Sequence, residues 1–277
     1  MTAQIGFPAD RAPSPWTRVV RPRPAARLRL ICLPWAGGGA SGYRDWPSHL
    51  PDDVEVVAVQ LPGREARFAE PPVSSMEPLV ARLAAGILGQ LDRPFALFGH
   101  SMGALIAFEL ARRLRSMGRE PARLLVAGSR APHLPSRRAR DRHTLPDQEF
   151  VSTVRELGGM PPEVLGSPDL LDLVLPALRA DFALVETHTH GAGPVLHCPI
   201  SAFGGVEDDD VGRDDLAAWS RHTTGPFRSH LLPGGHFFVH SSRESLLRIV
   251  ATEVDGGGGE RSICTAKVSA TGVRPRR

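Results

Sequence analysis

The sequence contains few cysteines, and none has the spacing of a metal site. Its 277 residues include only Cys32, Cys198 and Cys264, an odd number without the paired spacing of zinc sites or disulfide frameworks. Cys32 lies in an expected strand and Cys198 borders one, so we interpret both as small buried residues in a reducing compartment. This predicts a cytoplasmic protein rather than a disulfide-stabilised secreted one.

Long apolar runs and a large excess of one charge are also missing. Nowhere do about eighteen apolar residues follow one another, and the N-terminus has no continuous apolar segment of the signal-peptide kind. The net charge is only +3, and many of the arginines lie near the two ends of the chain. Without a nucleic-acid-binding motif beside them, these arginines are typical of solvated tails. We therefore expect a soluble protein with neither a membrane nor a nucleic-acid partner.

The most informative segment is 95–117, where a strand pattern passes directly into a helix pattern. Residues 95–98 form an apolar run that predicts a buried strand, and apolar residues recur at helical spacing from Met102 onward. Between them lies Gly-His-Ser-Met-Gly, residues 99–103, a G-x-S-x-G motif at a strand-to-helix turn. Small residues are expected there because the turn is tight, and Ser101 would stand at the helix N-terminus, near unpaired N–H groups. An ordinary glycine-rich turn with an exposed serine is the alternative interpretation.

Expected strands and helices alternate through the first half of the chain. A helix is expected at about 75–90 and another after Ser101, and two further strands follow a helical insert. The expected strands are 28–33, 54–59, 95–98, 124–128, 199–203 and about 227–232. This alternation predicts an α/β fold with a mostly parallel sheet and helices on both faces.

The alternation stops between about residues 131 and 197. This segment has no convincing strand, whereas 147–157 and 167–186 have helical patterns, the second opened by Ser167 as N-cap. Pro176 should kink or divide that second helix. A helical insert between two strands predicts a lid over the strand ends, where open α/β sheets bind ligands. The alternative is a helical insert with no functional role.

Three parts of the chain differ in composition. Residues 1–27, rich in Pro and Arg, are expected to be irregular, and residues 28–254 contain every expected strand. Residues 255–277 begin with consecutive glycines after Asp255 and are polar and basic, which predicts a disordered tail.

A serine attacks an acyl group at neutral pH only when an imidazole accepts its proton and a carboxylate orients that imidazole. In α/β-hydrolases the acid and then the histidine follow the serine along the chain. His236, just after a late strand and behind two glycines, is the preferred base, with His240 as the fallback. Four acidic residues follow strand 199–203, at positions 207–210. Asp208 is the first choice for the acid and Asp209 the second.

The glycine-rich loop after strand 28–33, residues 34–40, does not have the spacing of a phosphate-binding loop. In a serine hydrolase the same loop has another use. One of its backbone N–H groups, with that of the residue after the nucleophile, forms the oxyanion hole. We choose the amides of Ala36 and Met102 as these donors.

Several blocks in this order resemble one known family. The chain is similar to the type II thioesterases that accompany modular polyketide and nonribosomal peptide synthetases, a branch of the α/β-hydrolases. The resemblance runs from about Leu28 to Val239 through the segments Leu33–Gly38, Val59–Glu65, Phe98–Ala104, Ala107–Arg112, Leu175–Phe182 and Gly234–Phe238.

This resemblance implies hydrolysis of aberrant or stalled acyl groups from the phosphopantetheine thiol of acyl- or peptidyl-carrier proteins. It implies no metal and no organic cofactor, and a monomer. The nucleophile of the family maps onto Ser101, its histidine onto His236, and its oxyanion donors onto the amides of Ala36 and Met102. Its acid segment, G-G-x-x-D-P-x-V, places the acid at Asp208.

The sequence departs from the family at two positions. Trp35 stands where the family usually has His, which changes the entrance or the acyl pocket. Asp209 stands where the family has Pro, which makes the acid loop less rigid and keeps Asp209 as an alternative acid.

Other functions use the same residues. A carboxylesterase, or a cyclising or acyl-transferring thioesterase, would form the same acyl-enzyme, and an inactive hydrolase fold could merely bind carrier proteins. About thirty leading residues are too few for an upstream carrier domain, which favours the editing role. His188 and His190 lack a third metal ligand, so we interpret them as ordinary loop residues. We hypothesise that four arginines near the start of the lid dock an acidic carrier protein, a solvated basic loop being the alternative: Arg137, Arg138, Arg140 and Arg142.

Overall fold

The computed structural model describes residues 14–137, 141–160, 162–191 and 193–255. The expected disordered tail lies outside these residues except for Asp255, and so do Cys264, Arg138 and Arg140. No helix in the described part of the chain is long and apolar enough to cross a bilayer.

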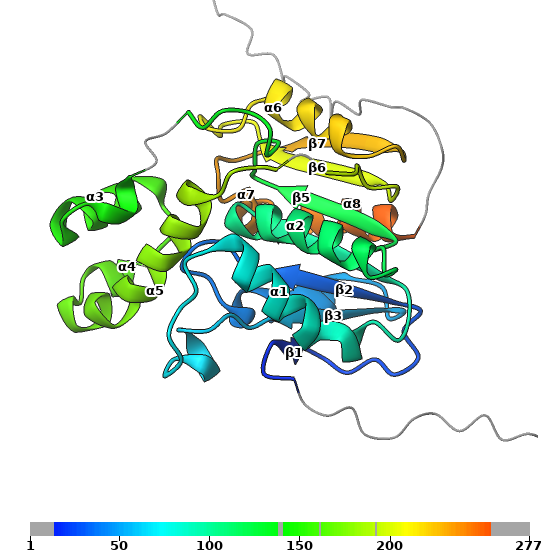
Figure 1. Ribbon diagram of the computed structural model, residues 1–277, viewed down its shortest axis with the longest axis horizontal. Helices are drawn as coiled ribbons and strands as arrows, with labels where there is room; N and C mark the ends of the chain where they lie inside the picture. Colours follow the sequence, from blue (N-terminus) through cyan, green and yellow to red (C-terminus); the bar gives the residue numbers. More distant parts are fainter. Residues whose placement is uncertain (1–13, 138–140, 161, 192, 256–277) are drawn as a thin grey trace, which may run out of the picture.

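A seven-stranded sheet forms the centre of the molecule (Figure 1), in the order β1-β3-β2-β4-β5-β6-β7. Only β1 is antiparallel to its neighbour, and all other pairs are parallel. The strands are β1 Thr17–Val19, β2 Leu28–Leu33, β3 Val54–Val59, β4 Phe95–His100, β5 Arg123–Ala127, β6 Ile200–Gly205 and β7 Phe227–Leu232. The predicted mostly parallel sheet is confirmed.

Strand β1 corrects the expectation that residues 1–27 are irregular. Thr17 lies opposite Val59 of β3 in an antiparallel pair. The buried guanidinium of Arg23 anchors the next turn, because it donates hydrogen bonds to the carbonyl oxygens of Pro47, Leu50, Pro51 and Val54. A three-residue edge strand is too short to give a periodic pattern, and Arg23 is buried only because these carbonyls surround it.

Helices cover both faces of the sheet. On one face, α1 Met76–Ile87, α2 Met102–Ser116 and α6 Arg213–Ala217 share a core with strand residues such as Ile31 and Leu33. On the other, α7 Phe238–Ser241 and α8 Arg243–Val254 pack against alternate residues of the same strand, Leu30 and Cys32. Figure 1 shows α1 and α2 in front of the sheet and α8 behind it. Because strand side chains alternate between faces, a continuously apolar strand serves both cores.

Short 3-10 helices lie in the connecting segments of the chain. They are η1 Ala40–Tyr43, η2 Trp46–His49, η3 Glu65–Arg67, η4 Leu88–Gln90, η5 Arg142–Thr144 and η6 Ala218–His222.

Three helices lie together to one side of the sheet (Figure 1): α3 Asp147–Leu157, α4 Pro162–Leu165 and α5 Pro168–Thr187. We call them the lid. They have a small core of their own, formed by Phe150, Val154, Leu175, Leu178 and Phe182. The lid therefore packs as a unit beside the α/β domain.

Helix α5 starts as predicted but is not divided. The Oγ of Ser167 accepts a hydrogen bond from the amide of Leu170 at 3.4 Å, so the predicted N-cap is confirmed. Of the two outcomes expected at Pro176, a kink or a division of the helix, division is wrong, because α5 continues through the proline to Thr187. Leu175 and Ala177 on either side of the proline are buried, and this packing offsets the lost backbone hydrogen bond.

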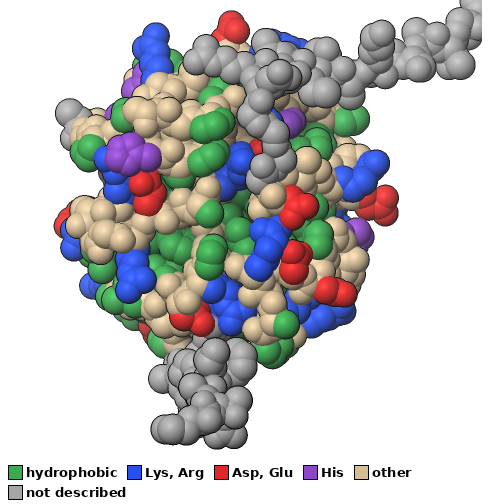
Figure 2. Space-filling view, turned by 90° about the vertical axis from the view of Figure 1, so that its right-hand side faces the viewer, with side chains coloured by type: hydrophobic (Ala, Val, Ile, Leu, Met, Phe, Trp, Pro, Cys, Tyr) green, Lys and Arg blue, Asp and Glu red, His purple; other side chains and the backbone are tan. Residues whose placement is uncertain are grey.

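The side of the molecule away from the lid carries balanced charge. At the amino ends of the central strands, Arg27 pairs with Asp53 and Arg29 with Glu55 and Asp92. Figure 2 shows this side, with basic and acidic side chains next to one another rather than gathered by sign. A phosphate backbone is bound by clustered positive charge, and this view shows no such cluster.

Candidate active site

Ser101 occupies a strained turn between β4 and α2. Its backbone has φ 55° and ψ −116°, a conformation that a residue other than glycine adopts only when its surroundings force it. The amide of Ser101 donates to the carbonyl oxygen of Ala127 at 2.8 Å, which ties the turn to the end of β5. The side chain consequently stands at the carboxyl edge of the sheet.

The glycines beside Ser101 are required by close backbone contacts. A Cβ atom at Gly99 would lie 2.0 Å from the carbonyl oxygen of Gly103, and one at Gly103 would lie 2.2 Å from that of Leu33. The turn therefore packs directly on the loop that leaves β2. The steric reason that the sequence suggested for these glycines is confirmed.

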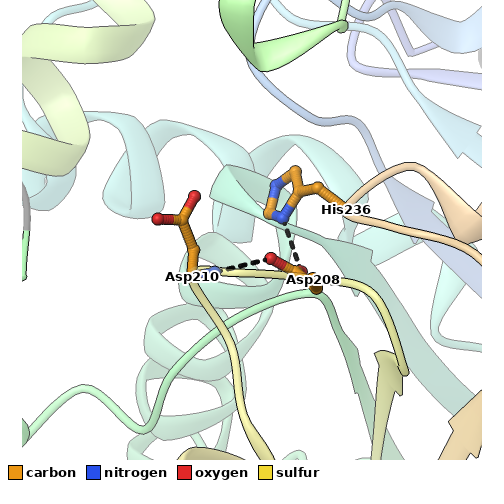
Figure 3. A group of neighbouring side chains, drawn as sticks. All are labelled: Asp208, Asp210 and His236. Atoms are coloured by element: carbon orange, nitrogen blue, oxygen red, sulfur yellow. Dashed lines mark hydrogen bonds and ion pairs between the residues drawn. The ribbon is translucent and has the colours of Figure 1, made fainter.

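Asp208 and His236 reach Ser101 from the loops that follow β6 and β7, two adjacent strands of the sheet. His236 Nε2 lies 3.0 Å from Ser101 Oγ, and His236 Nδ1 lies 2.8 Å from Asp208 Oδ2. Figure 3 shows the imidazole directed at the carboxylate of Asp208. A Cβ at Gly205 would lie 2.3 Å from the carbonyl oxygen of Gly234, so glycine at the end of β6 lets the acid loop and the histidine loop touch.

Asp208 is held as a carboxylate. Its side chain is only 1% exposed, and its other oxygen, Oδ1, accepts the amide of Asp210 at 3.0 Å (Figure 3). Burial favours the neutral acid, but the hydrogen bond and charge of His236, together with two backbone amides, outweigh it and lower the pKa of Asp208 below its usual range. Asp209 is exposed, so the structure brings Asp208, and not Asp209, to His236.

Two other histidines surround the site without contacting Ser101. His240 is packed edge-on against Trp35, with ring centroids 4.9 Å apart. His100 is fully buried beneath His236, and burial, followed by the charges of His236 and His240, holds its pKa well below the usual value. The lowered pKa makes His100 a weaker proton acceptor than an ordinary histidine.

A cavity of about 740 Å³ lies between the lid and the ends of the strands. Ser101 and His236 line it, as do Ala36 and Met102, the two residues whose amides the sequence suggested as oxyanion donors. Its outer wall is apolar and comes mainly from the lid: Val154, Leu157, Met160, Val164, Leu173, Val174, Ala177, Leu178, Phe182 and Val185. The serine is therefore reached through an apolar chamber.

The site thus combines a nucleophile turn, an imidazole and a carboxylate beneath a lid. The chain also matches the model of a known protein family. The thioesterase domain model matches residues 28–254. The chain belongs to the thioesterase family. Its membership makes it a thioester hydrolase and confirms the resemblance and the α/β-hydrolase fold inferred from the sequence.

Individual relatives of this thioesterase are similar over most of their length. Gramicidin S biosynthesis protein GrsT of Aneurinibacillus migulanus is 40% identical over 231 residues, which cover 83% of this chain and 90% of GrsT. Thioesterase PikA5 of Streptomyces venezuelae is 42% identical over 230 residues, covering 81% and 80%. The structure of the type II thioesterase BorB from the borrelidin biosynthetic cluster matches with a TM-score of 0.81 at 40% identity, covering 88% of this chain and 100% of BorB.

The sequence did not indicate a buried ion pair that joins the lid of this thioesterase to the cavity floor. Both oxygens of Asp181 on α5 accept hydrogen bonds from Arg64 at 2.7 Å. Burial disfavours the charged guanidinium, but the charge and hydrogen bonds of Asp181 raise the pKa of Arg64. Both residues stand inside blocks that carry the family resemblance, which is the signal that could have drawn attention to them.

Asp208, Asp210 and His236 are the one set in the described part of the chain whose donor atoms are close enough for a metal ion. Because Nδ1 of His236 and Oδ2 of Asp208 face each other at hydrogen-bond distance, we interpret these two as a hydrogen-bonded pair with Asp210 beside it rather than as metal ligands. The other two histidines considered as metal ligands contact Glu109 instead. Nε2 of His188 lies 3.3 Å and Nδ1 of His190 lies 3.6 Å from Glu109 Oε1.

The arginines considered for carrier docking are engaged within the chain where the structure describes them. Arg142 Nε donates to the buried Glu186 at 2.7 Å. Arg137, which is half exposed, lies 3.2 Å from Asp215. Docking by these two would have to compete with internal ion pairs.

Proposed function

We propose that this thioesterase hydrolyses aberrant or stalled acyl groups from the phosphopantetheine thiol of acyl- or peptidyl-carrier proteins in polyketide or nonribosomal peptide biosynthesis. The observation that carries the proposal is the array of Ser101, His236 and Asp208 at the floor of an apolar chamber. Relatives named for gramicidin S and borrelidin biosynthesis support this substrate class.

Acylation begins with attack of Ser101 Oγ on the thioester carbonyl carbon. The hydroxyl proton passes to His236 Nε2, and Asp208 stabilises the resulting imidazolium. The carbonyl oxygen becomes an oxyanion, which the amides of Ala36 and Met102 stabilise. When the intermediate collapses, the C–S bond breaks, and the departing thiolate takes the proton from His236.

Deacylation repeats these steps with water. His236 removes a proton from a water molecule as its oxygen attacks the acyl-serine carbonyl carbon. The second tetrahedral intermediate collapses with cleavage of the ester bond, Ser101 recovers its proton from His236, and the carboxylic acid leaves. Neither half of the reaction needs an electron acceptor or a cofactor.

The chamber suits an acyl chain. Apolar lid residues, Leu157, Val174 and Phe182 among them, would cover a hydrocarbon tail and remove it from water. Trp35, at the position where the family usually has His, adds an aromatic wall beside Gly38 and His240.

The test is release of acyl groups from a phosphopantetheinylated carrier protein carrying acetyl, propionyl or longer acyl chains, followed by mass spectrometry. We expect wild type to release them and Ser101→Ala to release none above the uncatalysed rate. Rapid turnover of simple oxygen esters with no release from any carrier would instead indicate a carboxylesterase. A cyclised product would indicate an acyl-transferring thioesterase, and failure of a fluorophosphonate to label Ser101 would indicate a binding module.

We further propose that the enzyme works as a monomer in the cytoplasm. Cys32 and Cys198 are buried free thiols, and free thiols are typical of a reducing compartment. Light scattering at catalytic concentrations tests the monomer, and a dimer mass would contradict it.

A further inference from the structure

The loop that carries Ala36 forms a tight turn. The amide of Gly38 donates to the carbonyl oxygen of Trp35 at 2.9 Å, and Gly37 has φ +77°, as a type II turn requires at its third residue. In such a turn the peptide between Ala36 and Gly37 can rotate at low cost unless a partner fixes it. The partner of the Gly37 amide therefore helps to hold the turn in this form.

Asp181 of the lid is the partner of that amide. Its Oδ2 accepts the Gly37 N–H at 2.8 Å and Arg64 Nη1 at 2.7 Å, while Oδ1 accepts Arg64 Nη2 at 2.7 Å. Arg64 Nη1 also donates to the carbonyl oxygen of Gly38 at 3.1 Å. Asp181 is 2% and Arg64 9% exposed, so these charge-assisted bonds are shielded from water and directional.

A second contact brings the same helix face onto the turn. Leu178 lies one helical turn before Asp181, and a Cβ placed on Gly37 would be 3.0 Å from its Cδ1. Helix α5 thus contacts Gly37 both through an apolar side chain and through a carboxylate.

The other end of the glycine loop is held by the α/β domain alone. Glu65 Oε1 accepts both the amide and the hydroxyl of Ser41, at 3.1 and 2.5 Å. Glu65 has φ +48°, a strained value that this contact helps to explain. Glu65 and the bond from Arg64 to the Gly38 carbonyl oxygen belong to the α/β domain, whereas the anchor at Gly37 depends on the position of the lid.

We propose that Asp181 is a positioning residue for the oxyanion hole: by holding the amide of Gly37, it fixes the turn that presents the Ala36 N–H to the substrate. The inference rests on the proposed oxyanion role of Ala36. Its consequence is that the oxyanion hole is complete only when helix α5 is seated on the α/β domain, so that closure of the lid over an acyl chain and activation of its carbonyl are one event.

Stability alone does not account for this arrangement. A buried ion pair is often replaceable by apolar residues without loss of stability, because desolvation offsets the attraction between the charges. An apolar replacement of Asp181 could keep the lid in place, but it would leave the amide of Gly37 without its acceptor. The carboxylate at this place is explained by the turn that it holds.

The experiment compares Asp181→Ala and the milder Asp181→Asn with a matched control, Glu186→Ala. Glu186 is also buried on α5 and also pairs with an arginine, but its hydrogen-bond partners, Arg142 and His143, lie just before α3 in the lid segment and not in the oxyanion loop. Steady-state kinetics use an acyl N-acetylcysteamine thioester, with folding checked by circular dichroism. Binding is measured for an alkyl trifluoromethyl ketone, which forms a tetrahedral adduct with serine, and for the matching alkyl thioether, which does not.

We expect Asp181→Ala to lower kcat by about 10- to 100-fold with KM changed less than about threefold, as displacement of an oxyanion donor should. Its affinity for the trifluoromethyl ketone should fall by a similar factor and that for the thioether should not. Asp181→Asn should show the same pattern more weakly, and Glu186→Ala should change thioether binding or KM without that selective loss. Equal loss for both ligands, or the same kcat loss in Glu186→Ala, overturns the inference.

The ligand measurements separate this inference from the proposed function. If wild type fails to release acyl groups from carrier proteins but still binds the ketone through Ser101, the carrier proposal fails, whereas the selective effect of Asp181 remains testable. If wild type releases acyl groups and the selective effect is absent, only the role of Asp181 is wrong.

Discussion

Gly103 sets how closely the nucleophile turn approaches the oxyanion loop. A methyl group there would lie 2.2 Å from the carbonyl oxygen of Leu33 and 2.7 Å from that of Pro34, and backbone atoms cannot rotate aside as a flexible side chain can. The first two turns of α2 and the loop after β2 would have to separate. Their separation would also move the amides of Met102 and Ala36 apart.

We predict that Gly103→Ala lowers kcat by about 100-fold or more and destabilises the fold by about 1–3 kcal/mol. The control is Gly89→Ala in η4, where an added Cβ meets nothing within 4 Å. Kinetics on a simple thioester and urea unfolding of both variants provide the measurement. Wild-type activity in Gly103→Ala would mean that the loop tolerates a shift and that the donor amides are placed differently.

Replacing Asp208 and Asp209 separately by Asn tests which of the two adjacent acids serves His236. We predict that Asp208→Asn lowers kcat by about 10³- to 10⁴-fold, because a neutral amide neither holds the imidazole tautomer nor stabilises its charge. Asp209→Asn, at an exposed position, should stay within about threefold of wild type. Comparable losses in both, measured by acyl release, would show that Asp209 takes over when the loop moves.

The order of residues along the chain was enough to direct Ser101, His236 and the acidic run 207–210 to one site, because parallel strands deliver their carboxyl ends to one edge. Within that run, the family resemblance favoured Asp208, and Asp209 stayed open until the structure placed Asp208 against His236. It could not select Asp181. That side chain meets Arg64 across 117 residues of sequence, and a single acidic residue in an amphipathic helix has the pattern of an exposed one until the tertiary contact is known.

At the scale of elements, strands were predicted well because each central strand is a continuous apolar run bounded by turn residues. The exception, β1, is a three-residue strand whose pairing with β3 comes from tertiary structure. In α5, the prediction relied on the intrinsic tendency of proline to break a helix at Pro176. Buried neighbours on both sides keep the helix continuous instead. Local propensity failed where packing was stronger.

One buried carboxylate of helix α8, that of Glu253, forms hydrogen bonds with the sheet. Glu253 accepts hydrogen bonds from Arg123 at 2.6 Å and Ser201 at 2.8 Å, and lies 3.1 Å from His230. Burial favours its neutral form, but the hydrogen bonds of His230 and Ser201 and the charge of Arg123 outweigh it and lower the pKa of Glu253 to about 2. The charged form therefore joins three strands to the helix.

We predict that Glu253→Gln costs about 3 kcal/mol in the free energy of unfolding, because it leaves buried cationic groups without their anion. Glu244→Gln, at an exposed position in the first turn of the same helix, should change it by less than about 0.5 kcal/mol. Urea denaturation followed by tryptophan fluorescence measures both. Equal midpoints would show that the network contributes nothing net.

At the scale of the whole molecule, histidines lie where the two ends of the lid segment meet the α/β domain. His222 follows α6, and its Nε2 lies 2.8 Å from Nδ1 of His133 near the start of the lid. The ring of His190, near its end, lies 5.1 Å from His222, edge to face. Burial, and then the charges of His133, His190 and Arg112, lower the pKa of His222 to about 4.

This environment makes the stability of the molecule depend on pH in a definite direction. The unfolded chain protonates His222 near its usual pKa of about 6.5, whereas the folded chain keeps it neutral down to about 4. As the pH falls through that interval, the unfolded state binds more protons, so the free energy of unfolding falls, by up to about 1.4 kcal/mol per pH unit for this group. Buried His100, whose pKa is also lowered, acts in the same direction. Glu253 contributes only below about pH 4.5, its usual value.

We predict that His222 accounts for about 2 kcal/mol of the fall in the free energy of unfolding of wild type between pH 7 and pH 5, so that His222→Gln loses about 2 kcal/mol less than wild type over the same interval. Glutamine reaches toward His133 with an amide that does not titrate, so the variant removes the protonation and keeps a polar partner. The control is His49→Gln, because His49 is exposed and its replacement should leave the wild-type slope unchanged. Urea unfolding at several pH values gives the slopes directly. Parallel curves for wild type and His222→Gln would show that His222 is as easily protonated in the folded chain as in the unfolded one. The fall in the free energy of unfolding at low pH would then come from other groups.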